Sequence, residues 1–357
     1  MVSRLHSHAL DRSRPLWEFH LIEGLERNRF AFYLKLHHAL VDNINAVPLL
    51  LQGLSAGARS KSTAAPWTRP LRAAESRPEA WWEDLADPWQ AATSLGRAAG
   101  GMLRGALRPR AASSVLMPRG TPRSTLNRQI NSQRRFATWQ LSQARIEAVA
   151  AATDSTVNEI LTYLCGSSLR RFFKEYNALP DDSLVAVIPV TLQERSERLP
   201  GNAIAGLRVS LGTHIGDPMA RLQAVKKSIH AVRKDRASLP SEAVTSYVLM
   251  RAAPLHASQL RGVGRLVPPL FNLAVSNTPG SAKPLYFNGA RLEAVYPMSP
   301  LLQFTALSID CVSYADTLNV GFTGALDTLP HLQRLAVYVG QAVADLEELL
   351  GQKEGGR

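Results

Sequence analysis

Two adjacent histidines and an aspartate lie close together in the stretch LKLHHALVDN, residues 34–43. His37 and His38 are followed by Asp42, four residues after the second histidine, and then by Asn43. Imidazole titrates near neutral pH, so histidine is the usual general base for removing a proton from a hydroxyl group. The stretch is compatible with such a base, and equally with histidines that only support a core.

The spacing of these residues can be read in two ways. Counted from His38 it is His-x3-Asp, and counted from His37 it is His-x4-Asp, the spacing of glycerol-phosphate acyltransferases. Both readings imply acyl transfer to a hydroxyl, on different folds. A metal site is the poorer interpretation, because no third histidine or carboxylate cluster stands nearby. The charge of Asp42, if buried near a strand end, would need a partner such as arginine.

The histidines must be positioned by the segment before them. The aromatic stretch that begins at Phe30, FAFYLKLHHAL, predicts a strand with the histidines at or just past its end. On an extended strand neighbouring side chains point to opposite faces, so we expect only one histidine to face a site. A helix is expected to begin within INAVPLLLQGL, residues 44–54.

Regular patterns return after Phe136. Thr156 and Glu159 have the spacing of a capping box at a helix start, and Asp217 with Pro218 begins a second amphipathic helix. Strands are predicted over 184–190, 203–211, 271–277, 301–312 and 317–324, and a last helix over 329–350 with Gly351 as its stop. Strands and helices are mixed without strict alternation, which favours an α+β sandwich over a doubly wound parallel sheet.

The bulk composition is that of a globular chain of one large or two smaller domains, with 357 residues and 45% apolar residues. The two cysteines, Cys165 and Cys311, lie in apolar surroundings and are interpreted as buried thiols without a disulfide framework. Neither a signal peptide nor an apolar run of roughly 20 residues is evident. We therefore expect a cytoplasmic protein, peripheral to a membrane or lipid inclusion.

The net charge of +12 is unevenly distributed, since ten arginines and no acid occur between Arg97 and Arg145. Such a stretch suits an anionic partner such as lipid headgroups or a nucleotide phosphate, and equally a solvated linker. Nucleic acid is not expected as a partner, because interleaved aromatic residues and known recognition motifs are missing. The pair Trp81 and Trp82 would anchor the chain at a lipid interface if it were exposed.

Five blocks in order resemble the bacterial wax ester synthase/acyl-CoA:diacylglycerol acyltransferase (WS/DGAT) family, across nearly the whole chain. These blocks are RSRPLWEFHLIEGL (12–25), KLHHALVDN (35–43), STVNEIL (155–161), LPGNAIAGLRVSL (199–211) and LAVSNTPGS (273–281). The Pro-Leu-Trp-Glu and Ser-Asn-x-Pro-Gly blocks are specific. The histidine motif is shared with a wider superfamily that includes chloramphenicol acetyltransferase and condensation domains.

This resemblance implies two chloramphenicol acetyltransferase-like α/β sandwich domains with a tunnel between them. His38 would be the general base, and His37 and Asp42 would be structural. Acyl-CoA would be the co-substrate without a further cofactor, and diacylglycerol or a long-chain alcohol the acceptor. Peripheral association with a membrane or lipid droplet follows from such substrates.

Further residues match family positions beside the tunnel. Asn277 and Ser276 are candidates for stabilising the oxyanion of the tetrahedral intermediate, where each donor is worth roughly 3–4 kcal/mol in other systems. Asn158 would support the site, next to Glu159, which stands where the family has an aspartate. The block at Pro15, Leu16 and Trp17 is structural or acceptor-related in the family.

The chain also departs from the family. Asn43 replaces a glycine, and asparagine is the other residue that readily accepts positive φ. Roughly 90–100 residues before a Val2-like position are expected to be missing, an estimate from domain size. The resulting division is a remnant of the N-terminal domain (1–85), a basic linker (86–130) and a C-terminal domain (131–357). The first domain is thus expected to be incomplete, with an unpaired sheet edge.

Three functions follow from these observations. The leading one is an acyl-CoA-dependent O-acyltransferase that makes triacylglycerol or wax esters with His38 as base. A catalytically impaired truncated remnant that binds only lipid or a partner is the second. A condensation-type acyltransferase with a carrier-protein donor is the third.

Overall fold

The structure is a computed structural model of the chain. It describes residues 1–41, 46–60, 121–191, 204–237, 259, 264–265 and 268–355. Asp42, Asn43, the Trp81–Trp82 pair and most of the expected linker over 86–130 lie outside the described residues. The domain boundaries predicted from the sequence therefore stay predictions.

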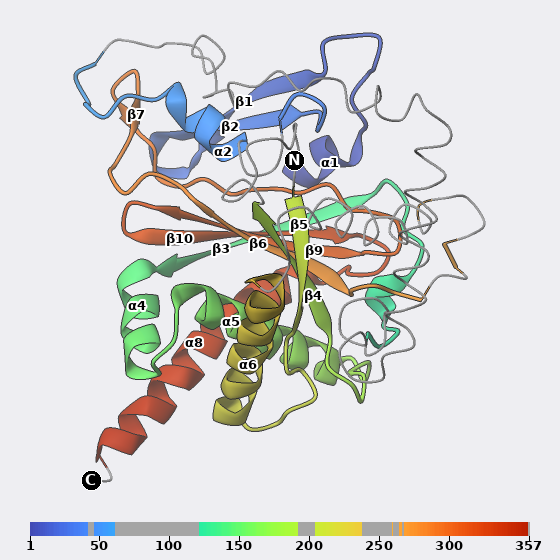
Figure 1. Ribbon diagram of the computed structural model, residues 1–357. Helices are drawn as coiled ribbons and strands as arrows, with labels where there is room; N and C mark the ends of the chain where they lie inside the picture. The colour runs from blue at the N-terminus through green and yellow to red at the C-terminus, as the bar shows by residue number, and fades with distance from the viewer. Residues whose placement is uncertain are drawn as a thin grey trace.

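The N-terminal elements form a layer of their own beside the main sheet (Figure 1). They are α1 (Val2–Ser7), β1 (Trp17–Leu25), β2 (Arg29–Leu36) and α2 (Ala46–Gln52). The two strands pair antiparallel, with Trp17 opposite Leu36. The strand predicted before the histidines and the helix predicted after them are confirmed, whereas β1 was not predicted as a strand.

The hairpin of β1 and β2 has one face toward the body of the protein and exposes apolar side chains on the other. Tyr33 is buried on the inner face. The exposed apolar side chains are 40–51% accessible and comprise Trp17, Phe19, Leu21, Leu25 and Phe30. Phe32 contacts Phe19, Phe30 and Phe287 at ring-centroid distances of 4.9–5.3 Å. The hairpin is thus held by aromatic packing, yet leaves a large apolar surface open.

The main sheet has six strands in the order β3-β10-β9-β6-β4-β5. Its strands are β3 (Arg134–Ser142), β4 (Val185–Thr191), β5 (Ile204–Ser210), β6 (Leu273–Pro279), β9 (Leu307–Tyr314) and β10 (Thr317–Ala325). Strand β6 runs parallel to β4 and β9, and the other neighbours are antiparallel. A small hairpin, β7 (Tyr286–Phe287) and β8 (Ala290–Arg291), stands apart. The mixed sheet confirms the predicted α+β class.

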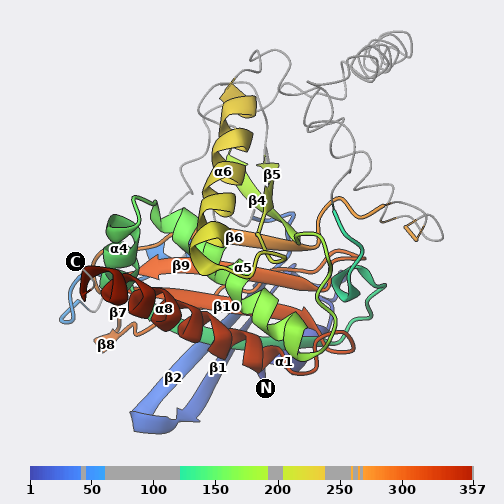
Figure 2. The same ribbon diagram turned by 90° about the horizontal axis from the view of Figure 1, so that it is seen from below.

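Four helices cover the face of the sheet that points away from the N-terminal layer (Figures 1 and 2). They are α4 (Gln143–Ala152), α5 (Val157–Glu175), α6 (Pro218–Ala237) and α8 (Leu332–Gly355). Their starts agree with the sequence: the Ser142 hydroxyl caps α4, and the Asp217 carboxylate accepts a bond from the Ala220 N–H in the first turn of α6. The predicted stop at Gly351 was wrong, because α8 continues to Gly355.

The two faces of the sheet differ in chemistry because strand residues alternate. On β9, Ile309 and Cys311 point into the apolar core beneath the helices, whereas Asp310 points toward the N-terminal layer. Both cysteines are free and buried, as predicted. The core therefore lies between the sheet and its helices, and a polar surface faces the layer that carries the histidines.

Candidate active site

The histidine pair lies in a turn immediately after β2 ends at Leu36. The His37 N–H donates to the Leu16 carbonyl at 2.9 Å, and the His37 carbonyl accepts from the Leu40 N–H at 2.9 Å. The Nδ1 atom of His37 accepts from the Ala39 N–H at 3.1 Å. His37 therefore holds the turn with its backbone and ring, and Leu16 of the Pro-Leu-Trp block holds His37.

His38 is exposed at this turn, whereas His37 is partly buried. Because both residues follow β2, the expectation from alternating strand faces does not apply to them. Their exposures differ because the ring of His37 turns back onto the backbone of its own loop. Asp42 and Asn43 lie outside the described residues, so their predicted roles stay predictions.

The strand that carries the histidines is anchored to the main sheet through His6. Its Nδ1 lies 3.1 Å from the Tyr33 hydroxyl of β2, and its ring also bonds to the Ser299 backbone. Burial is the largest cause that lowers the pKa of His6 to about 4, and the charges of Lys35 and Arg134 act in the same direction. A neutral His6 thus joins α1, β2 and the loop before β9.

Ser299 of the same loop contacts a buried carboxylate on β9, that of Asp310, which is 3% exposed. The carboxylate accepts from the hydroxyls of Ser276 (2.6 Å), Ser299 (2.9 Å) and Ser308 (2.9 Å). Burial raises the pKa of the Asp310 carboxyl above its usual range, against the effect of these hydrogen bonds. Tyr33, His6, Ser299 and Asp310 form a continuous hydrogen-bonded chain from β2 to β9, which we call the interlayer chain.

The interlayer chain predicts a pH-dependent stability. Because the pKa of His6 is depressed from 6.5 to about 4, its contribution is present above pH 6.5 and is lost as the pH falls toward 4. His6→Gln keeps a donor and an acceptor but cannot be protonated. We expect urea unfolding of the wild type to lose stability between pH 6.5 and 4 more steeply than this variant. Parallel curves would contradict it.

Ser276 and Asn277, both proposed from the sequence as oxyanion donors, are brought to opposite faces of β6. Ser276 donates to Asp310 on the side of the N-terminal layer. Asn277 instead donates through Nδ2 to the Asn158 Oδ1 at 2.7 Å, at the start of α5. Only one of the two side chains can therefore face a given tunnel, and the asparagine pair joins the Ser-Asn-x-Pro-Gly block to α5.

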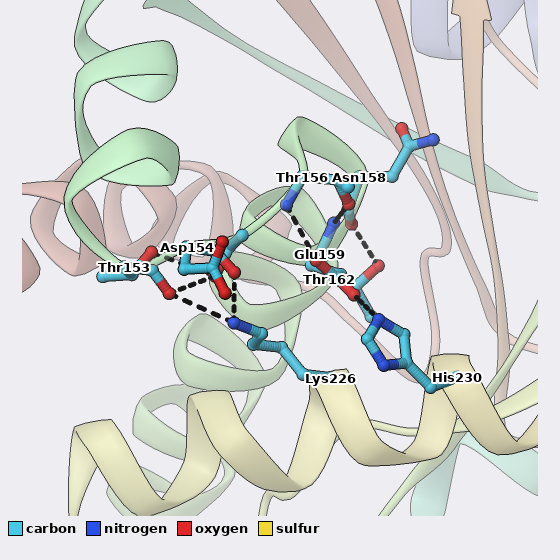
Figure 3. A network of polar contacts seen from close by, with 9 residues as sticks. Thr153, Asp154, Thr156, Asn158, Glu159, Thr162, Lys226 and His230 are labelled. Atoms are coloured by element: carbon cyan, nitrogen blue, oxygen red, sulfur yellow. Dashed lines mark hydrogen bonds and ion pairs between the residues drawn. The ribbon is translucent and has the colours of Figure 1, made fainter.

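Glu159, next to Asn158, is held inside a polar network between α5 and α6 (Figure 3). Its Oε2 accepts from the Thr156 N–H at 2.7 Å, which completes the predicted capping box, and its Oε1 lies 2.9 Å from the His230 Nε2. Burial would raise the pKa of Glu159, but the hydrogen bonds from Thr156 and the charges of His230 and Lys226 outweigh it and lower the pKa.

The Glu159 network is separate from the asparagine contact, because the Asn158 side chain points away from it in Figure 3. Lys226 extends the network by donating to the carbonyls of Thr153 (3.1 Å) and Asp154. Glu159 therefore fixes α5 against α6, while Asn158 reaches β6. The sequence placed both residues at a helix start, as observed, and the supporting role predicted for Asn158 at the reaction site stays a prediction.

The sequence reasoning missed His6, Tyr33 and Asp310. Asp310 had a signal that could have found it, since it is an acid inside the otherwise uncharged strand LSIDCVSY. His6 had none, because its partners lie far away in the chain. Among the residues that the structure describes, no helix is long and apolar enough to cross a membrane, and no cluster of three metal-binding side chains occurs.

Helices cover one face of the mixed main sheet, and the N-terminal layer that carries the histidine turn lies on its other side (Figure 1). The profile of the wax ester synthase/diacylglycerol acyltransferase catalytic domain matches residues 1–161, and that of the WS/DGAT C-terminal domain matches residues 200–347. The chain belongs to the WS/DGAT family and is an acyltransferase. The predicted resemblance and the α+β fold class are thereby confirmed, whereas the predicted incompleteness of the first domain stays a prediction.

Individual relatives agree with this assignment. A Mycobacterium tuberculosis protein named as a diacylglycerol O-acyltransferase is 36% identical over 353 residues, which cover 98% of this chain and 78% of the relative. A Mycobacterium bovis protein of the same description is 38% identical over 356 residues, covering 97% and 77%. The wax ester synthase/diacylglycerol acyltransferase from Marinobacter aquaeolei superposes with a TM-score of 0.77 at 32% identity, covering 98% of this chain and 76% of that structure.

Proposed function

We propose that the protein transfers a fatty acyl group from acyl-CoA to the hydroxyl of diacylglycerol or of a long-chain alcohol, with His38 as general base. The observation that carries the proposal is the exposed His38 on a turn that His37 and Leu16 hold, in a chain of this family. The relatives' names support both acceptor classes: diacylglycerol for the mycobacterial proteins, and diacylglycerol or the alcohol that becomes part of a wax ester for the Marinobacter enzyme.

The proposed reaction is a single displacement. His38 removes the hydroxyl proton while the oxygen attacks the thioester carbonyl. The tetrahedral intermediate collapses with cleavage of the carbon–sulfur bond, and the proton held by His38 passes to the leaving CoA thiolate. The products are an ester and CoA, and no acyl-enzyme is formed. A positioned base typically contributes 10²–10⁴-fold to such a rate.

The oxyanion of the intermediate requires a donor placed in advance. Ser276 is the predicted donor on the side of the N-terminal layer that carries His38, and its hydroxyl proton, donated to Asp310 in this structure, would turn to the oxyanion. Asn277 lies on the opposite face of β6, where its amide donates to Asn158. In this proposal Ser276 is the oxyanion donor, and the Asn158–Asn277 pair fixes β6 against α5.

Peripheral association with a membrane or lipid droplet forms part of the same proposal. Both acceptors are lipids, and the hairpin exposes Trp17, Phe19, Leu21 and Phe30. Tryptophan and phenylalanine on such a surface suit the interface between headgroups and acyl chains.

The function is tested by incubating the purified protein with palmitoyl-CoA and either dioleoylglycerol or hexadecanol. CoA release is measured with a thiol reagent, and the ester is measured by chromatography. We expect acceptor-dependent CoA release and an equal amount of ester. A folded protein that releases no CoA with either acceptor would support the catalytically impaired alternative. Acylation that requires a carrier-protein donor would support a condensation-type enzyme.

A further inference from the structure

A pocket of about 400 Å³ lies at the end of the main sheet where β6 begins. Three arginines line it: Arg123 and Arg128 from the basic stretch, and Arg265 from a distant segment. None of the described side chains around it is acidic. Its volume is within the range of small-molecule sites, and its positive charge favours an anionic ligand.

The remaining described arginines of the basic stretch are used by the protein itself. Arg145 pairs with Glu347 at 2.5 Å, Arg134 donates to the Gln133 carbonyl, and Arg135 donates to the Pro330 carbonyl. Arg123 and Arg128 instead stand exposed at the pocket. The pocket therefore accounts for the two described arginines of the stretch for which no internal contact is shown.

The wall of the pocket is built before any ligand arrives. The Asn127 side chain donates to the carbonyls of Phe271 (3.0 Å) and Phe304 (3.1 Å), and it accepts from the buried Asn272 at 2.7 Å. Phe304 is held at φ 63°, a conformation that is rare for a bulky residue. Backbone strain of this kind concentrates at ligand sites.

The orientation of Arg265 is also fixed, since its Nη2 donates to the Gln129 Oε1 at 2.8 Å. An amide partner orients the guanidinium without neutralising its charge. Planar guanidinium groups bind phosphate oxygens bidentately, and the aromatic and proline side chains beside them offer a surface for a flat ring. This combination suits a phosphorylated nucleotide better than a simple inorganic anion.

We propose that this pocket binds the nucleotide end of the acyl-CoA donor, with Arg123, Arg128 and Arg265 on its phosphates. The proposal rests on the proposed function, because acyl-CoA is the donor there. Ser276 follows Phe271 at the pocket by five residue steps, a span of up to about 17 Å. This span is comparable to the pantetheine arm, so nucleotide and thioester can occupy the two ends of β6 at once.

The kinetic test compares Arg265→Gln and Arg128→Gln with Arg233→Gln, the same change at an exposed position of α6. We expect the first two to raise the KM for palmitoyl-CoA about tenfold, with kcat and the KM for the acceptor unchanged. For the wild type, the KM for palmitoyl-dephospho-CoA should be about tenfold higher than the KM for palmitoyl-CoA. For the two variants, removing this phosphate should raise the KM little further. Equal KM values for all variants would overturn the proposal.

A binding test separates this proposal from the proposed function. Calorimetry with 3′,5′-ADP needs no turnover, and we expect binding that weakens about tenfold in Arg265→Gln and falls with salt. If ADP binding depends on the arginines but no acyl transfer occurs, the proposed function is wrong and the proposed nucleotide pocket is supported. If acyl transfer occurs but ADP binding does not depend on the arginines, only the proposed nucleotide pocket is wrong. Variants that only lose sedimentation with phosphatidic-acid vesicles would assign the arginines to a lipid surface and overturn the proposal.

Discussion

Replacing His38 with alanine is expected to lower kcat for ester formation by about 10²- to 10⁴-fold, the usual contribution of a general base. The KM values for acyl-CoA and acceptor should change little, because the imidazole removes the proton in the transition state and does not contribute to substrate affinity. The measurement is CoA release under saturating substrates. Because His38 is exposed, its loss should leave thermal unfolding close to that of the wild type.

Two control variants sharpen this result. His214→Ala removes another exposed histidine and should keep wild-type turnover. His37→Ala removes the ring that accepts from Ala39, so it should lower stability as well as rate. If His38→Ala retains wild-type turnover, the base lies elsewhere. If His37→Ala abolishes turnover in a folded protein and His38→Ala does not, His37 is the general base.

Replacing Asp310 with alanine is expected to lower the free energy of unfolding by about 3 kcal/mol. The change leaves the hydroxyls of Ser276, Ser299 and Ser308 without their acceptor in a buried place, and each such group costs about 1–3 kcal/mol before relaxation. Urea unfolding at neutral pH measures the loss. Asp181→Ala, at an exposed position, is the matched control and should lie within about 0.5 kcal/mol of wild type.

Asp310→Asn keeps the shape of the side chain but removes its ability to ionise, so it isolates the effect of the charge on stability. Since the pKa of Asp310 is raised above its ordinary 3.8, the folded protein keeps this proton to higher pH than the unfolded chain. Its contribution is therefore fully present below pH 3.8 and is lost as the pH rises through the raised value. Relative to Asp310→Asn, the wild type should lose stability as the pH rises over that window. A constant difference between the two would show that Asp310 has an ordinary pKa.

The two titrating groups of the interlayer chain thus act in opposite directions. Protonation of Asp310 favours the fold, and protonation of His6 opposes it. In the wild type the two pH dependences of stability partly cancel. Each is therefore measured in a variant that removes the other titrating group. Asp310 is connected to β2 through Ser299 and His6, so Asp310→Ala should also lower turnover by disturbing the strand that ends at the histidines.

Local features of the fold followed well from the sequence. Thr156 and Glu159 were recognised as a capping box, and β2, β4, β5, β6 and β10 appear within a few residues of their predicted bounds. Capping and strand formation depend on neighbours within a few positions, which a single sequence displays directly. The exceptions are β9, which begins at Leu307 rather than Leu301, and α8, which passes through Gly351.

What the sequence by itself determined was the acyltransferase family, the α+β class and the residues that carry its motifs. Only the tertiary structure decided which of those residues meet. It set Ser276 and Asn277 on opposite faces of β6, joined Asn158 to Asn277, and placed a neutral His6 between Tyr33 and Ser299. It also gathered Arg265 with Arg123 and Arg128 around one pocket. These partners are separated by more than a hundred residues in most cases, and sheet order and register, which depend on the packing of the whole chain, bring them together.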